Sequence, residues 1–440
     1  MSGRVIPSKF MHKDSKIGVD SFRDVTVERV RLQPVASSSQ TVFRPDTLNK
    51  ISFKIPCFSQ SFMDTSRSFI SMEVACSNTN VVGMNFSNNL NLFNRIVIRS
   101  SSGVTLEDIN NAEILSKLLM ITNENGDHKQ DEGVFGNRDP TYGMATSSKT
   151  VIFRFSTGIL SKFLSSYLPL WLMDGGSGNS ALELDLYLSK PEMCLVATTA
   201  TAAIGASYTI TNPIYNICLL KLDSNLCSKF DSIICDENES IEIDYTTFHS
   251  HAHVLGSQKN IISIHENATC LRRIWSVFLD TVQAVDNKQG LHFHGSLNDT
   301  DAKKQVVKYN YKVGTQNVYN EAVEEVHNNS VSMQYVKDSL WNHDKPLLIM
   351  GADTQQHNNF ESGSSGMYTT VASFNYSQES EKGIIQGISS SSPIQHTVDF
   401  KESPANELTC YNFAEVTYKL KIQKGVLSFL EPKAGSQSVY

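Results

Sequence analysis

The sequence predicts an all-β protein made of two tandem β-sandwiches. Apolar and polar residues alternate along much of the chain, as in 182–188, and a period of two is typical of half-buried strands. The length of 440 residues fits two β domains, since single sandwiches reach roughly 200–250 residues. Both halves follow the same layout, in which strands are interrupted by a loop that carries a helix. The repetition is architectural, because the sequence itself shows no repeat of fixed period.

The composition is that of a folded, weakly acidic chain. Apolar residues make up 40% of the sequence and charged residues 19%, which excludes a disordered protein because such chains combine low hydrophobicity with high net charge. The 38 basic and 45 acidic side chains give a net charge of −7. A globally basic nucleic-acid-binding protein is therefore not expected.

Cysteine spacing and the first residues indicate where the protein is made. The eight cysteines are spread over the chain without a closely spaced pair, so a structural zinc site is not predicted. Residues 1–16 lack the apolar core of a secretory signal peptide. We expect a protein that is made inside the cell without a secretory signal and that keeps its thiols reduced.

Residues 1–40 differ from the rest of the chain in charge. They contain seven basic and four acidic side chains, a local charge of +3. Pro7, Pro34 and a run of three serines predict an extended basic arm rather than a packed element. The basic residues of the arm are Arg4, Lys9, Lys13, Lys16, Arg23, Arg29 and Arg31.

In the first half, alternation predicts strands and a change of period predicts one helix. The clearest strands are 51–55, 70–74, 93–100 and 182–188. Asp108 is a candidate N-cap for an amphipathic helix of about three turns. The apolar residues at helical spacing are Ile109, Ala112, Leu115 and Leu119. The polar segment that follows, 122–148, is predicted to be a long loop, and loops of that length tend to be functional.

The second half repeats this layout after a seam predicted at 212–240. A helix is expected over 321–341, interrupted at Asn328 and Asn329, and a loop rich in glycine, serine and asparagine over 351–366. The expected strands lie at 241–245, 274–279, 309–313, 368–376, 397–400, 416–422 and 426–430.

Three histidines, His249, His251 and His253, alternate in a predicted strand. Residues two apart share a face, so these side chains point together, as a metal site or a pH-sensitive cluster requires. No carboxylate or cysteine is spaced to complete a ligand set, so no metal site is predicted and the three remain candidates only. His292 and His294 form a weaker pair of the same kind.

Motifs of catalysis and of nucleic-acid binding are missing from the sequence. It contains no Gly-x-Ser-x-Gly, no His-Glu-x-x-His and no P-loop. The glycine-rich segment 175–178 lies between 171–173 and a strand and is interpreted as a turn. Glu324 and Glu325 are interpreted as the solvated face of a helix. The basic and aromatic segment 271–275 opens a run that is apolar on both faces, which favours a core strand. An enzyme is not expected.

An ordered set of segments carries a resemblance to a known family. They read NLFNRIVIRSSSGVTLEDINNAEILSKLL (91–119), YLPLWLMDGGSGNSALELDLYLSKP (167–191), YTITNPIYNICLLKLD (208–223), SLWNHDKPLLIMGADTQQ (339–356), SGSSGMYTTVASFNY (362–376) and FAEVTYKLKIQKGVLSF (413–429). The set resembles the double jelly-roll major capsid proteins of the adenovirus and tectivirus lineage, particularly those of polinton-like viruses and virophages. It extends over about 45–430 of the chain.

The resemblance implies two tandem eight-stranded jelly rolls with short helices in the long loops. They would occupy 41–222 and 223–432, between the arm at 1–40 and a C-terminal tail at 433–440. Members of the family form homotrimers, pseudo-hexagonal capsomers that tile an icosahedral shell around double-stranded DNA. Their long loops build outward towers, which here would be 122–148 and 351–366.

The partners implied by the resemblance are macromolecular. They are further copies of the chain, penton proteins and minor capsid proteins within the virion, with no cofactor and no small-molecule substrate. The basic arm could reach an internal membrane, the genomic DNA or a neighbouring capsomer. The alternative function is that of a tandem β-sandwich protein that binds carbohydrate or a receptor.

Overall fold

The structure is a computed structural model, and a defined part of the chain is described from it. None of the described helices is both long and apolar enough to cross a membrane. The described residues are 26–35, 42–76, 81–84, 92–123, 149–162, 164, 166–173, 180–197, 207–222, 224, 228, 241–266, 268–280, 293–297, 299, 301–325, 330–339, 368–374, 388–390, 393–423 and 426–429.

The first half of the chain folds into a sandwich of two antiparallel sheets. One sheet has the strand order β1-β12-β4-β8, with β2 beside β12 and β9 beside β4, and the other has the order β3-β10-β6-β7. A small ribbon, β5 with β11, lies apart from both sheets. The strands are β1 (Thr26–Leu32), β2 (Val42–Phe43), β3 (Lys50–Ile55), β4 (Ser61–Cys76), β5 (Val81–Met84), β6 (Phe93–Ser100), β7 (Thr105–Asn110), β8 (Lys149–Phe153), β9 (Leu168–Pro169), β10 (Leu182–Leu188), β11 (Leu195–Ala197) and β12 (Tyr208–Lys221); the helices are α1 (Ala112–Asn123), η4 (Leu170–Leu172) and α3 (Pro191–Cys194).

The second half builds the same kind of sandwich. Its sheets have the orders β13-β23-β15-β16, joined by β20, β21 and β24, and β14-β22-β17-β18, joined by β19. The strands are β13 (Ile241–Leu255), β14 (Lys259–Ile264), β15 (Ala268–Asp280), β16 (Phe293–His294), β17 (Val306–Val313), β18 (Gln316–Asn317), β19 (Val323–Glu324), β20 (Thr370–Ser373), β21 (Ile388–Ser390), β22 (Ile394–Phe400), β23 (Leu408–Gln423) and β24 (Val426–Phe429); the helices are η6 (Ala302–Lys304) and α6 (Ser330–Ser339).

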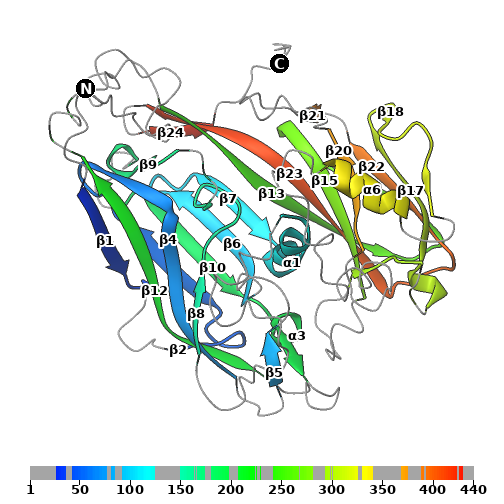
Figure 1. Ribbon diagram of the computed structural model, residues 1–440, viewed down its shortest axis with the longest axis horizontal. Helices are drawn as coiled ribbons and strands as arrows, with labels where there is room; N and C mark the ends of the chain where they lie inside the picture. The colour runs from blue at the N-terminus through cyan, green and yellow to red at the C-terminus, as the bar shows by residue number, and fades with distance from the viewer. Residues whose placement is uncertain are drawn as a thin grey trace, which may run out of the picture.

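In both sandwiches the opening strand lies beside the closing one. β1 pairs with β12, and β13 pairs with β23 along fifteen residues. Within each roll the chain crosses repeatedly between the two sheets, which is typical of a jelly roll. The predicted fold class, two tandem jelly rolls, is therefore confirmed. Figure 1 shows the two rolls side by side, with α1 between them.

Alternation along β10 shows why the strand predictions hold. Leu182, Leu184 and Leu186 are buried in the core of the first roll, between β3 and β6. Asp185 points to the opposite face, where it accepts hydrogen bonds from Ser52 and from Arg99, at 2.7 and 2.6 Å. The polar residues of the strand thus make a network on the outer face of the sheet while the leucines fill the core.

The structure corrects the predicted start of the first helix. Asp108 belongs to β7, where the Arg95 guanidinium donates to both of its carboxylate oxygens at 2.7 and 2.6 Å. The helix instead begins after Asn111, whose φ of 54° turns the chain and whose carbonyl accepts the first two helical N–H bonds. Asparagine tolerates this left-handed conformation, so the turn can follow the strand directly. The twelve residues of α1 confirm the expected three turns.

The structure also corrects the predicted lengths of the second helix and of the segment between the two rolls. Within the described residues of 321–341, helix is found at Ser330–Ser339, and Val323–Glu324 is instead strand β19, paired with β17. The seam predicted at 212–240 is shorter than expected because β12 continues to Lys221 as the closing strand of the first roll.

Part of the expected N-terminal arm is a strand. Residues 26–32 form β1, which pairs with β12 over all seven residues. Val30 and Leu32 pack against the first core and alternate with Arg29 and Arg31, which are exposed. Burial of these two side chains and pairing with β12 fix the segment at the edge of the sheet. The folded first roll therefore begins before residue 40.

One sheet of the second roll serves both cores. Along β15, Leu271, Ile274 and Phe278 lie in the apolar cluster inside the second roll. The intervening residues Trp275 and Val277 belong to the cluster that fills the first roll. We call β13, β23 and β15 the shared sheet. Because this sheet is apolar on both faces, its outer face must be covered as well, and the cluster on that face is continuous with the core of the first roll.

Candidate functional site

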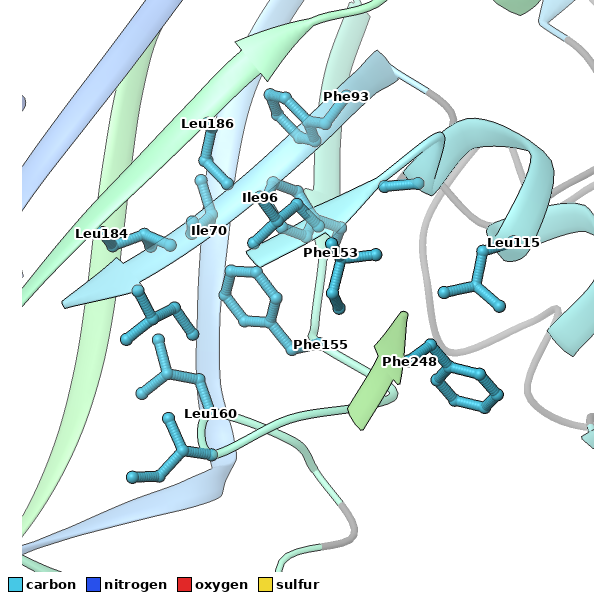
Figure 2. Packing of buried hydrophobic residues seen from close by; sticks show 14 of the residues in the cluster. Ile70, Phe93, Ile96, Leu115, Phe153, Phe155, Leu160, Leu184, Leu186 and Phe248 are labelled. Carbon is cyan, nitrogen blue, oxygen red and sulfur yellow. The ribbon is translucent and has the colours of Figure 1, made fainter. Parts of the chain in front are cut away.

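The first roll contacts the second mainly through the strand, turn and helix at 105–123. We call β7, Asn111 and α1 the clasp, because they contact the edge strand β13 from both faces. On one face Tyr245 donates to the Leu106 carbonyl at 2.7 Å, and on the other the Asn111 amide donates to the Ser250 hydroxyl at 2.8 Å. Phe248 joins residues of α1 and of the first roll in one apolar cluster, shown in Figure 2.

A carboxyl group is buried inside the clasp. Glu107 is 3% exposed, and its Oε1 accepts a hydrogen bond from the Thr247 hydroxyl at 2.8 Å. Gly158 packs directly on this carboxyl group and donates its backbone N–H to the Thr246 carbonyl at 2.7 Å. Burial raises the pKa of Glu107 to about 7, against smaller opposing effects of the Thr247 and Ile159 hydrogen bonds and the charge of His249.

Replacing Gly158 should weaken the joint between the rolls. Gly158 has a φ of 82°, and a Cβ there would lie 1.9 Å from the Glu107 Oε2 atom. We expect Gly158→Ala to lower the free energy of unfolding by roughly 2 kcal/mol or more, from backbone strain and the displaced carboxyl group. Urea unfolding followed by circular dichroism measures the loss.

Gly103 supplies the matched control for this substitution. It has a nearly identical φ of 84°, but nothing lies within 4 Å of a Cβ placed on it. Gly103→Ala should therefore lower the free energy of unfolding only by the cost of the strained backbone conformation. Equal losses for the two variants would show that the contact with Glu107 contributes nothing.

The histidine row contains a pair bridged by a carboxylate that sequence spacing did not reveal. Glu266, 5% exposed at its side chain, contacts His249 Nδ1 at 2.9 Å through Oε1 and His251 Nε2 at 3.1 Å through Oε2. The Tyr418 hydroxyl lies 3.3 Å from His249 Nε2. Despite the cost of burial, hydrogen bonds and charge from both histidines lower the pKa of Glu266 to about 2.

The third histidine of the row is separate from this bridge. His253 lies further along β13, where burial and the nearby His251 and His265 lower its pKa. Among the described residues, no three histidine, cysteine, aspartate or glutamate side chains are arranged to hold a metal ion. Glu266 follows β14, which lies in a different sheet from β13, so no expected strand pairing could have placed this carboxylate beside His249.

The basic residues assigned to the arm fall into two groups. Arg29 and Arg31 are exposed on β1, at the outer edge of the first roll. The other five lie outside the described residues: Arg4, Lys9, Lys13, Lys16 and Arg23.

The remaining sequence candidates are mostly structural. Segment 271–275 is core strand as predicted, with Trp275 1% exposed. The interpretation of Glu325 as a solvated helix residue is wrong: it is 4% exposed, and both the backbone N–H and the hydroxyl of Ser332 donate to its carboxyl group. Glu324, on β19, pairs with Lys308 at the surface.

Other candidates are only partly described or lie outside the described residues. His294 pairs with Asp299 at 2.7 Å, whereas His292 lies outside the described residues. The same is true of the glycine-rich segment at 175–178 and of loop 351–366. In loop 122–148, residues 122–123 end α1, 149 begins β8, and 124–148 lie outside the described part.

Comparison with known proteins places the architecture of the whole chain. No family model matches the sequence, and no curated protein matches it. Similar solved structures include the PBCV-1 virus capsid (TM-score 0.60, 10% identity, 95% of this chain and 99% of that one). The fold is a double jelly roll. The same fold recurs in the Sputnik virophage structure (0.56, 10% identity, 100% and 95%) and in the mavirus major capsid protein (0.52, 12% identity, 95% and 92%).

Proposed function

We propose that this chain is a major capsid protein, a structural component of a virion. The supporting observation is that both jelly rolls, and not one alone, match capsid structures over 95–100% of the chain and 92–99% of the matched chains. Three copies would form a pseudo-hexagonal capsomer, and capsomers would tile an icosahedral shell around double-stranded DNA. We assign the first roll to 41–222 with β1 added at its edge, the second to 223–432, and a C-terminal tail to 433–440.

The packing within one chain supports this role. The clasp already joins two rolls laterally, and a ring of six rolls needs the same kind of lateral contact between chains. Obligate interfaces of this kind bury about 2,000 Å² or more. The small net charge of −7 limits repulsion between identical neighbours in a shell.

The purified protein is expected to be a trimer with no stable monomer. Light scattering should give three times the chain mass of 48.9 kDa, and electron microscopy should show pseudo-hexagonal particles or shells. A monodisperse, folded monomer would contradict the proposal. A glycan array tests the alternative, a carbohydrate-binding protein, on the same sample.

We further propose that residues 1–25 contact the shell interior or a neighbouring capsomer. This segment carries Arg4, Lys9, Lys13, Lys16 and Arg23, whose charge suits an internal membrane, genomic DNA or an acidic surface. Penton and minor capsid proteins are the other partners that this function implies.

Deleting residues 1–25 should leave trimers intact and reduce the yield of particles. Deleting 1–40 should also destabilise the first roll, because it removes β1 and exposes the edge of β12. Particle yield by sedimentation and the thermal midpoint of the trimers separate the two effects. Normal particles from the shorter deletion would refute a role for the arm in assembly.

A further inference from the structure

Two buried carboxyl groups lie on the clasp, one on each side of its turn. Glu107 in the middle of β7 is 3% exposed, and Glu113 in the first turn of α1 is 2% exposed. In each, the Oε2 atom is buried and makes no hydrogen bond within the described structure. Neither carboxyl group takes part in an ion pair among the described residues, and the charge of His249 offsets only part of the cost of burial at Glu107. Burying a carboxylate in this state costs far more free energy than burying the neutral acid.

The surroundings of Glu107 come from three elements. From β13, Thr247 donates to Oε1, His249 contributes its charge, and the Tyr245 hydroxyl lies close enough for Glu107 to raise its pKa. From the segment after β8, the Ile159 backbone donates a hydrogen bond and Gly158 packs on the carboxyl group. From β23, Tyr418 reaches His249 rather than Glu107. The site is a closed pocket of polar but largely neutral groups between the two rolls.

Glu113 faces the other side of the shared sheet. Its Oε1 accepts a hydrogen bond from the Asn94 side chain of β6 at 2.9 Å. It lies close enough to Tyr411 of β23 to raise the pKa of that phenol. Both carboxyl groups therefore sit where the first roll meets the second, and opening the joint would return both to water.

We propose that the clasp is a proton-operated joint: it holds the second roll tightly when Glu107 and Glu113 are protonated, and it loosens when they ionise. The device belongs to a single chain, so it stands or falls independently of the proposed capsid function.

Burial of the two carboxyl groups determines both the direction in which pH changes the stability of the joint and the pH range over which it does so. Burial raises the pKa of both groups to about 7 from 4.5, so the closed joint binds protons more tightly than the open one. The joint is tightest below pH 4.5 and loses stability as the pH rises to about 7. Glu266 stays ionised throughout, because its pKa is about 2, and Tyr418 stays neutral, because its pKa is about 12.

Hydrogen exchange of the backbone amides in β13 and α1 tests the joint. After correction for intrinsic rates, the opening equilibrium should increase between pH 5 and pH 7.5 by on the order of 50-fold for each carboxyl group. Glu107→Gln and Glu113→Gln should each remove one such factor, and each should make the joint open less at pH 7.5 than in the unchanged protein. Glu183→Gln, which removes a half-exposed partner of Lys54 on β10, should leave the pH profile as it was.

Two results would overturn the proposal. One is an unchanged pH profile of β13 exchange in both glutamine variants. The other needs no variant: infrared spectra of the unchanged protein at pH 6 should contain the carbonyl band of protonated carboxylic acids, since ordinary carboxyl groups are ionised there. If that band is missing, the joint carries no protonated acid and the proposal is wrong, even if the variants fail to fold.

Discussion

Mild acid is expected to unfold the second jelly roll from its interior, through His396. This residue on β22 is fully buried, its ring is stacked on Tyr311 at 4.3 Å, and its Nδ1 lies 3.2 Å from the Asn412 Oδ1 atom. That oxygen also accepts from the Ser276 hydroxyl, so Nδ1 carries the proton of the neutral ring. Nε2 has no partner within the described structure. A second proton would therefore place an uncompensated charge in an apolar core.

Lowering the pH should destabilise the second roll through His396, whereas it should stabilise the clasp. Burial lowers the pKa of His396 to about 3 from 6.5, outweighing the Asn412 hydrogen bond, and the nearby His253 adds to the decrease. Stability is complete above pH 6.5 and is lost as the pH falls through the range from 6.5 to 3. The loss is about 1.4 kcal/mol for each pH unit, or roughly 4 kcal/mol by pH 3.5.

His396→Asn should move the acid midpoint of unfolding to lower pH. Asparagine keeps a donor near the position of Nδ1 and cannot be protonated, although the space left by the smaller side chain should lower stability at pH 7. Near-ultraviolet circular dichroism between pH 7 and pH 3 follows the transition. His265→Asn, at an exposed position, should keep the original midpoint. If His396→Asn also keeps it, another group controls acid unfolding.

Removing the Trp275 side chain is expected to destabilise both rolls together. This residue on β15 is 1% exposed, belongs to the apolar cluster that runs from the first roll across the outer face of the shared sheet, and donates its indole N–H to Glu415 at 3.3 Å. Trp275→Ala should cost about 3–5 kcal/mol through the cavity, and more where the buried Glu415 oxygen loses its donor. For rolls of this size the thermal midpoint should fall by roughly 6–20 °C.

Because the two cores meet at the shared sheet, whether the two rolls unfold together is as informative as the thermal midpoint. Exchange of amides in β10 of the first roll and in β17 of the second should accelerate together in Trp275→Ala, because the lost side chain belongs to the core that joins them. Ile261→Ala, on the edge strand β14 at 71% exposure, should change neither. Acceleration confined to the second roll would show that the two cores unfold independently.

Sequence patterns predicted the elements well where one face is buried and the other is polar. The alternation of Leu182, Leu184 and Leu186 with polar residues predicted β10, because this pattern is typical of a strand in a sheet with one apolar face. The same logic was available for β1 in Val30 and Leu32, but the charges and prolines around them favoured an arm. Helix limits were less predictable, because Asn111 starts α1 through a left-handed turn that a pattern of apolar residues does not encode.

The joint could not be predicted because it depends on contacts far apart in sequence. Glu107 looks like an ordinary strand carboxylate until Thr247 and Gly158 enclose it from elsewhere in the chain. Glu266 is likewise remote from the histidines that it bridges. Segment 271–275 was recognised as core strand from its apolar character on both faces, but which roll covers each face became clear only from the packing.

The apolar outer side of the shared sheet has a consequence for biosynthesis. Trp275, Phe248 and Phe413 belong to a cluster that is continuous with the core of the first roll, and the first roll precedes the second in the chain. The earlier roll therefore acts as a template on which the later one can condense without presenting these side chains to other nascent chains. We therefore expect the second roll, released on its own, to expose this apolar face and to aggregate more readily than the whole chain.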